Sequence, residues 1–188
     1  GNGQDLPPLE AAVDELQAFE SSSPPEPAGP IDSVVLLLRY GAKASGWGTS
    51  NDEDPLCDAV RRNHIEAVRL LLAAGAEPNI RDEEGNSPLR ICVEKGYLEL
   101  ARLLLLCGAT KNIHEAGGGG SDMNVLGVAA YWLDVEMVRL LLAHGADPNV
   151  LDNDRVTVFE HLRSKEQYAD PPLDTAQIER LHEIRQLL

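Results

Sequence analysis

The chain has few aromatic residues, few cysteines and no long hydrophobic segment. Of its 188 residues, 4% are aromatic and three are cysteine. No run of eighteen apolar residues, no signal-peptide pattern and no Asn-x-Ser/Thr sequon occurs in the sequence. Three is an odd number, and Cys57, Cys92 and Cys107 lack metal-ligand spacing, so we expect small buried thiols in a reducing compartment. The sequence therefore favours an intracellular protein, nuclear or cytoplasmic.

Basic residues are also scarce relative to acidic ones. The chain contains 16 Lys and Arg against 31 Asp and Glu, a formal net charge of −15. This charge argues against nucleic acid or a membrane as the binding partner. It favours a basic partner, although an acidic surface also keeps a protein soluble.

A short pattern recurs along the chain. Gly-Ala follows a leucine triplet four times, at intervals of 34, 33 and 37 residues. Each unit contains a short apolar segment, a break, a longer apolar segment and a glycine, which predicts a helix, a turn, a second helix and a loop. Neither helix is long enough to be stable alone, so each pair must pack on its neighbours. The recurring pairs are Gly41-Ala42, Gly75-Ala76, Gly108-Ala109 and Gly145-Ala146. Helix starts are predicted at Pro55, Pro88 and Val125, and the four consecutive leucines 103–106 are expected in the core.

The spacing and content of these units resemble the ankyrin repeat. The residues that match its pattern are Ser87-Pro88-Leu89, Asn63-His64, Gly96-Tyr97, Gly145-Ala146-Asp147, Asn79, Asn112 and Asn149. The resemblance implies an all-α solenoid of stacked helix-turn-helix units joined by hairpin fingers. It also implies a concave groove, lined by the fingers and the short helices, that binds a protein partner.

We expect a single ankyrin-repeat domain over residues 4–188. The predicted repeats are 7–43 with an insertion, 51–79, 84–112, 122–150, and a C-terminal cap at 155–188. The cap is expected to contain a short helix at 159–164, a loop at 165–172 and a final helix at 175–188. The inward residues of this final helix are expected to be Ile178, Leu181, Ile184, Leu187 and Leu188. Residues 1–3 are interpreted as an expression-vector remnant. Residues 117–121, Gly-Gly-Gly-Gly-Ser, have the composition of an engineered flexible linker, with a natural glycine tract as the alternative.

No pattern of catalytic or metal-binding residues stands out. None of the five histidines lies in a Ser-His-Asp or Cys-His setting, and the carboxylates cluster in fingers that we expect to be exposed. Exposed carboxylates keep ordinary pKa values and are poor general acids. We therefore expect no enzyme activity, no cofactor, no metal and no small-molecule substrate.

The predicted binding residues combine acidic fingers with aromatic groove positions. Carboxylates could steer a Lys/Arg-rich segment, and the aromatic rings could cover a guanidinium or a lysine stem. We expect an otherwise monomeric protein to bind its partner through Trp47, Asp52, Glu53, Asp82, Glu83, Glu84, Glu94, Tyr131, Trp132, Asp152 and Asp154.

The leading hypothesis for function is a non-catalytic module that binds a basic peptide or protein. A chromatin reader that binds a histone tail and an escort, or chaperone, of a ribosomal protein are two versions of it. One alternative is a scaffold or adaptor, such as a substrate receptor of a ubiquitin ligase, that recognises a folded partner by shape. Another is a regulatory domain of a larger enzyme.

Overall fold

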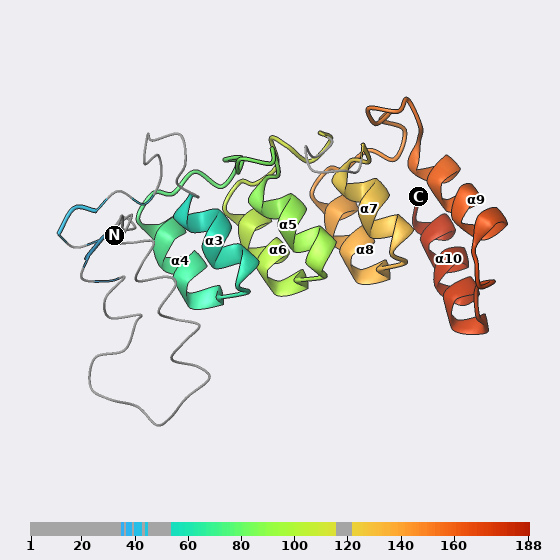
Figure 1. Ribbon diagram of the computed structural model, residues 1–188, viewed down its shortest axis with the longest axis horizontal. Coiled ribbons are helices and arrows are strands. Elements are labelled where there is room, and N and C mark those ends of the chain that lie inside the picture. The colour runs from blue at the N-terminus through green and yellow to red at the C-terminus, as the bar shows by residue number, and fades with distance from the viewer. Residues whose placement is uncertain (1–34, 36, 39, 43, 45–53, 116–121) are drawn as a thin grey trace, which may run out of the picture.

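The computed structural model describes residues 35, 37–38, 40–42, 44, 54–115 and 122–188 of the chain, and here the regular elements are α-helices arranged in a row (Figure 1). Three helix pairs and two longer C-terminal helices follow one another along the row. Their bounds are α3 Pro55–Arg61, α4 Ile65–Ala73, α5 Pro88–Lys95, α6 Leu98–Leu106, α7 Val125–Tyr131, α8 Val135–Ala143, α9 Val158–Tyr168 and α10 Thr175–Leu187.

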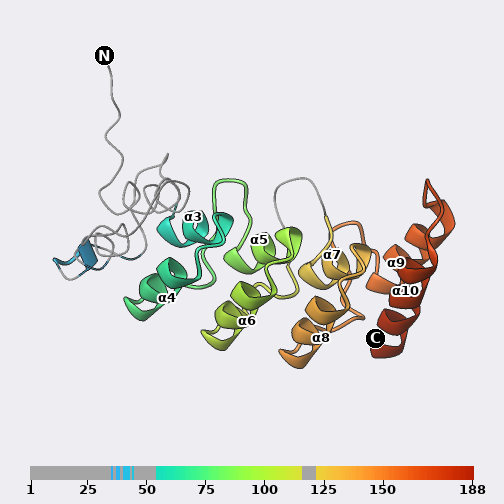
Figure 2. The ribbon, with the colours of Figure 1, turned by 90° about the horizontal axis from the view of Figure 1, so that it is seen from below.

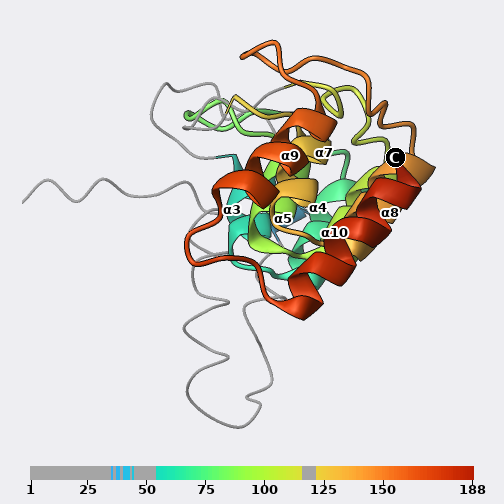
Figure 3. The ribbon, with the colours of Figure 1, turned by 90° about the vertical axis from the view of Figure 1, so that its right-hand side faces the viewer.

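The helices form two layers. In the first, α3 packs on α5, α5 on α7 and α7 on α9, and in the second, α4 packs on α6, α6 on α8 and α8 on α10. Figure 2 shows the two rows, and Figure 3 looks along them from the C-terminal end, with α9 and α10 in front. Each unit therefore contacts its neighbours, as expected of a helical solenoid.

The start of each first-layer helix follows from its sequence. Side-chain oxygens of Asp54, Ser87 and Asn124 accept hydrogen bonds from backbone N–H groups in the first turns of α3, α5 and α7. Pro55 and Pro88 occupy the first helical positions, where a missing N–H costs nothing. The helix starts predicted at Pro55, Pro88 and Val125 are the observed ones.

The leucine triplets supply the core between the layers. Leu71, Leu104 and Leu141 occupy equivalent positions of α4, α6 and α8, and each is 0% exposed. The core cluster is continuous from Ala44 to Ile184. Two predicted core positions are wrong, because α6 ends there: Leu106, in its last turn, is 74% exposed, and the thiol of Cys107, its C-cap, is exposed.

The other two cysteines are buried, as predicted. Burial raises the pKa of the Cys92 thiol, and the neighbouring Cys57 raises it further. Cys92 therefore behaves as a small apolar side chain and not as a reactive thiolate.

Asparagines in the inter-repeat loops join consecutive units. The Asn79 side chain donates to the carbonyl of Gly108 at 3.0 Å and accepts from the Lys111 N–H at 3.0 Å. Asn112 donates to the backbone carbonyl of Asn79 at 2.9 Å. The loops that contain the repeat's characteristic asparagine are therefore hydrogen-bonded to one another across repeats.

The last two helices differ from the prediction. Helix α9 continues to Tyr168, so the loop expected from residue 165 begins only at 169. The reason is that Lys165, Glu166 and Gln167 are good helix formers, and no glycine stops the helix. In α10, Leu181 and Ile184 are buried as expected, whereas Ile178, predicted to point inward, is 41% exposed.

The predicted first repeat falls largely outside the described residues. Of the segment 7–43, Val35, Leu37 and Leu38 are helical, and Leu37 and Leu38 pack against the core. The proposed linker at 117–121 and the insertion around residues 21–27 lie outside the described part of the chain.

Candidate functional site

The groove positions of the four described repeats lie at the ends of the first-layer helices. Each position is seven or eight residues beyond the N-cap residue of its helix, at residues 54, 87, 124 and 157. Helices α3, α5 and α7 end at or just before these positions, so their side chains extend past the packed core. The residues are Arg61-Arg62, Glu94-Lys95, Tyr131-Trp132 and Ser164-Lys165.

Two of these pairs are tied to the fold by ion pairs. Arg61 bonds to Asp82 at 2.6 Å, and Arg62 bonds to Asp58 at 2.9 Å. In the next repeat, Glu94 accepts from the buried Arg90 guanidinium at 2.6 Å, and Arg90 also donates to the backbone carbonyl of Met123. Glu94, predicted to bind a partner, thus already compensates an arginine whose side chain is only 3% exposed.

The aromatic pair of the fourth repeat projects into solvent. Trp132 is 64% exposed and Tyr131 is 36% exposed. Their ring centroids are 5.8 Å apart and the rings are nearly perpendicular, at 82°. Burying two such rings against a partner would remove a large apolar area from water, and aromatic residues of this kind are common in binding hot spots.

A lysine from the next repeat lies on this pair. The Lys165 Nζ, from α9, is 4.2 Å from the centroid of the Tyr131 ring and 5.9 Å from that of Trp132. Both distances fall within the range of a cation–π interaction. Burial lowers the pKa of the Lys165 ammonium below its ordinary value. The aromatic pair therefore already contacts a cation of the same chain.

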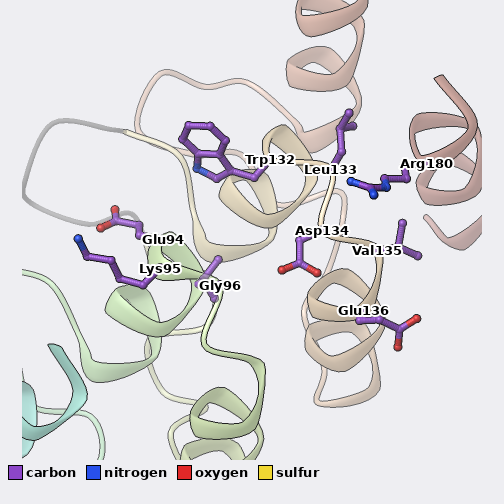
Figure 4. Close-up of a pocket in the computed structure, with 10 residues that line it drawn as sticks. Glu94, Lys95, Gly96, Trp132, Leu133, Asp134, Val135, Glu136 and Arg180 are labelled. Carbon is purple, nitrogen blue, oxygen red and sulfur yellow. The ribbon is translucent and has the colours of Figure 1, made fainter. Parts of the chain in front are cut away.

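Cavities flank the pair on its two sides. Trp132 lines one of about 500 Å³ between the third and fourth repeats, with the other side chains shown in Figure 4. Tyr131 and Lys165 line one of about 520 Å³ that the α9–α10 loop closes with Pro171 and Pro172. The first cavity holds three carboxylates and two cations: Glu94, Asp134, Glu136, Lys95 and Arg180.

The backbone beside Trp132 is strained. Leu133 has φ +58°, in the left-handed region where a leucine is rare, while Gly96 has φ +71° at the equivalent turn of the third repeat. Leu133 is only 3% exposed, so its buried side chain holds the turn in this conformation. The equivalent turn of the second repeat has Asn63 at φ +55°, so the left-handed residue belongs to the turn of the repeat and does not by itself mark a binding site.

Two predicted finger carboxylates are not exposed, which corrects the expectation for them. The side chains of Asp82 and Asp152 are 1% and 2% exposed. Each accepts from a backbone N–H of its own finger, that of Asn86 at 2.7 Å or Val156 at 2.9 Å. Asp82 pairs with Arg61, while Asp152 contacts the His161 ring at 2.5 Å. Each aspartate side chain thus bridges the two ends of its hairpin finger, so Asp82 and Asp152 stabilise the conformation of the fingers.

The remaining predicted carboxylates are exposed. Glu83, Glu84 and Asp154 lie at finger tips, and Asp122 joins them at the base of the fourth repeat. The backbone carbonyl of Asp122 accepts a hydrogen bond from the Asn153 N–H at 3.2 Å, so Asp122 lies beside the last finger. These carboxylates remain candidates for contact with a partner.

Trp47, Asp52 and Glu53 lie outside the described residues. Residues 1–53 carry 9 acidic and 2 basic residues, against 22 and 14 in residues 54–188. Close to half of the net negative charge therefore belongs to the first 53 residues, and residues 54–188 are less acidic than the composition of the whole chain suggests.

Sequence reasoning missed Lys165 and Tyr168, which the structure places beside the aromatic pair. Both were assigned to a loop. The available signal was the spacing from the helix start, because Lys165 lies eight residues beyond Thr157, as Trp132 does beyond Asn124.

Neither a membrane span nor a metal site is found in the described part of the chain. Over these residues, no helix is both long and apolar enough to cross a bilayer. The same residues include no group of three or more His, Cys, Asp or Glu side chains that could hold a metal ion.

Comparison with known proteins places the same repeat over most of the chain. The family model for ankyrin repeats in three copies matches residues 28–115, and the single ankyrin-repeat model matches residues 122–153. Palmitoyltransferase Hip14 of Drosophila melanogaster is 43% identical over 60 residues, which are 32% of this chain and 9% of that protein. Protein HOS4 of Saccharomyces cerevisiae is 34% identical over 77 residues, 41% of this chain and 7% of that protein. The matched segments thus span less than a tenth of either relative.

Proposed function

Because the chain belongs to the ankyrin-repeat family, a non-catalytic fold for protein–protein interaction, we propose that its groove binds a Lys/Arg-rich segment of a partner protein. The contact would centre on Tyr131 and Trp132, with the finger carboxylates around it. The observation that carries the proposal is the exposed aromatic pair, on whose rings an ammonium group already lies at 4.2 and 5.9 Å.

The energetic case rests on the two rings. A lysine or arginine over an aromatic face contributes about 0.5–1 kcal/mol when exposed and ~2 kcal/mol when the contact is desolvated. Trp132 also lines the cavity of about 500 Å³, where Asp134 and Glu136 supply negative charge. A neighbouring basic side chain of the same segment could pair with these carboxylates.

The exposed carboxylates of the fingers would act over a longer range. Glu83, Glu84, Asp122 and Asp154 are exposed, and acidic residues outnumber basic ones in residues 54–188. Such charge accelerates the encounter with a basic partner more than it stabilises the final complex. Binding should therefore weaken as salt rises, because exposed charges are screened within about 10 Å at 0.1 M salt. A histone tail and the basic extension of a ribosomal protein are partners of this chemistry.

The proposal is tested by fluorescence polarisation with labelled basic peptides, scrambled controls and two salt concentrations. We expect sequence-selective binding that weakens with salt. The double change Tyr131→Ala, Trp132→Ala should weaken it by about 2 kcal/mol or more. The matched control is Phe159→Ala, an aromatic residue of α9 that is 41% exposed and lines neither cavity. Equal binding to scrambled peptides, or unchanged affinity in the folded double variant, would contradict the proposal and direct the search to a folded partner recognised by shape.

A second candidate is a regulatory ankyrin segment of a larger enzyme. The observation in its favour is the 43% identity to a segment that makes up 9% of a palmitoyltransferase. The sequence of the complete gene distinguishes the two candidates, because a catalytic domain in the same reading frame would favour the second.

A further inference from the structure

We infer that Lys165 is an internal occupant of the cation site formed by Tyr131 and Trp132, and that a basic partner must displace it to bind. The inference rests on the proposed function and names how the same site is regulated. Three observations support it: the ammonium lies on the two rings, it has no ion-pair partner among the described residues, and a cavity adjoins it.

The position of Lys165 is that of a ligand. It belongs to α9, at the groove position of the fifth repeat, and reaches back to the pair on the fourth repeat. Its Nζ lies 4.2 Å from the Tyr131 centroid, while Trp132 stands almost perpendicular to Tyr131. An incoming lysine or arginine would seek the same ring faces.

The Lys165 ammonium is partly desolvated, and no carboxylate of the described residues forms an ion pair with it. Its side chain is half-buried, and burial lowers the pKa of the ammonium. Among residues 54–115 and 122–188, no ion pair of Lys165 within 4.0 Å is observed, whereas the neighbouring α9 residue Glu166 pairs with Arg185 at 2.7 Å. The rings alone offset the lost hydration, so the contact is weak enough to exchange.

There is also room for the displaced side chain. Lys165 lines the cavity of about 520 Å³ together with Tyr168, Pro171 and Pro172. Rotation about its long stem would carry the ammonium toward that cavity and Asp170, with α9 unchanged. The free protein therefore contains a closed and an open form of one site, and occupation by Lys165 reduces the apparent affinity in proportion to the closed fraction.

The test compares Lys165→Met with Lys95→Met, using the tightest basic peptide from the panel. Each change removes one positive charge next to the pair and keeps an apolar stem. Lys95 lines the cavity on the other side of Trp132 and makes no ring contact among the described residues, so it reports the charge effect alone. We expect Lys165→Met to tighten binding about threefold to tenfold, and Lys95→Met by less than about twofold. Equal gains, or weaker binding by Lys165→Met, would overturn the inference.

A second measurement does not depend on affinity. Ring currents should shift the Lys165 ε-methylene protons upfield in the free protein, and the shift should disappear when the basic peptide binds. An unshifted signal in the free protein, or a shift that persists at saturation, would also overturn the inference. If the parent protein binds no basic peptide at all, the proposed function fails first, and the signal in the free protein still shows whether Lys165 occupies the site.

Discussion

The third and fourth repeats share a backbone frame but use the same turn for different purposes. Glu94-Lys95-Gly96 of the third repeat corresponds to Tyr131-Trp132-Leu133 of the fourth. In the third, Glu94 compensates the buried Arg90, and Gly96 takes a positive φ without strain. In the fourth, two rings project into solvent beside a leucine with φ +58°.

The two repeats use the same turn position differently, one for the stability of the fold and the other for side chains exposed to solvent. The third repeat uses its groove position to satisfy an internal charge, and the strain-free glycine lowers the cost of the turn. The fourth exposes two large rings, which a stability argument does not explain, while its Leu133 takes a left-handed φ with a buried side chain. The exposed rings are the feature that the proposed binding role would explain.

The largest expected effect tests whether the two repeats share one frame. Leu71→Ala, Leu104→Ala and Leu141→Ala remove equivalent side chains that are each 0% exposed. Each should lower the free energy of unfolding by about 2–5 kcal/mol, through lost burial and a residual cavity. Urea denaturation followed by circular dichroism measures this. A variant that unfolds at the midpoint of the parent would show that the repeats are not in register, and the comparison would lose its basis.

A smaller effect separates the two turns directly. Glu94→Ala should lower the free energy of unfolding by about 1–2 kcal/mol, because it removes the carboxylate facing a buried guanidinium while Glu94 itself is 40% exposed. Trp132→Ala should change the same quantity by less than about 1 kcal/mol, since surface substitutions cost little.

Binding should follow the opposite order in these two variants. Trp132→Ala should weaken the basic peptide more than Glu94→Ala does, when both are measured by fluorescence polarisation. If Glu94→Ala leaves the urea midpoint unchanged and weakens binding instead, the glutamate contacts the partner, and the contrast between the two repeats disappears.

The sequence predicted the fold because its signals repeat. Pro55, Pro88, the leucine triplets and the Gly-Ala pairs each specify a local feature, and agreement among several units at one period removes the ambiguity of any one signal. The errors lie where the repetition ends. Leu106 is a triplet neighbour at a helix end, and α9 has no glycine at its end and continues to Tyr168.

The site was only partly predictable, because exposure depends on what a side chain meets across repeats. The exposed positions of Tyr131 and Trp132 were predicted from their register alone. In the sequence, Asp82 and Asp152 cannot be distinguished from the exposed finger carboxylates. In the structure, both are buried, because each accepts a hydrogen bond from the backbone of its finger and contacts a basic side chain. The spacing from Thr157 could have marked Lys165 as a groove position, but its contact with the rings depends on the packing of α9 on α7.

The smallest expected effect compares the loops that follow the repeats. Glu77 accepts from the backbone N–H and the side chain of Asn79, and Asp147 does the same for Asn149. Those hydrogen bonds lower the pKa of both carboxyls, from ordinary values of 4.5 and 3.8. The corresponding residue after the third repeat is Thr110, which has no carboxylate.

The sign of the pH dependence follows from the lowered values. A carboxyl whose pKa is lower in the folded state stabilises the protein above its ordinary pKa, and that contribution is lost as pH falls through the folded-state value. Glu77→Gln and Asp147→Asn should therefore each make the loss of stability below about pH 4.5 less steep. Thr110→Ser is the matched control and should leave the slope unchanged. Because both carboxyls are fully exposed, the change in slope should be the smallest of these effects, measured as urea midpoints over an acid pH series. An unchanged slope in both carboxyl variants would mean that these two loops, like the one after the third repeat, derive no stability from charge.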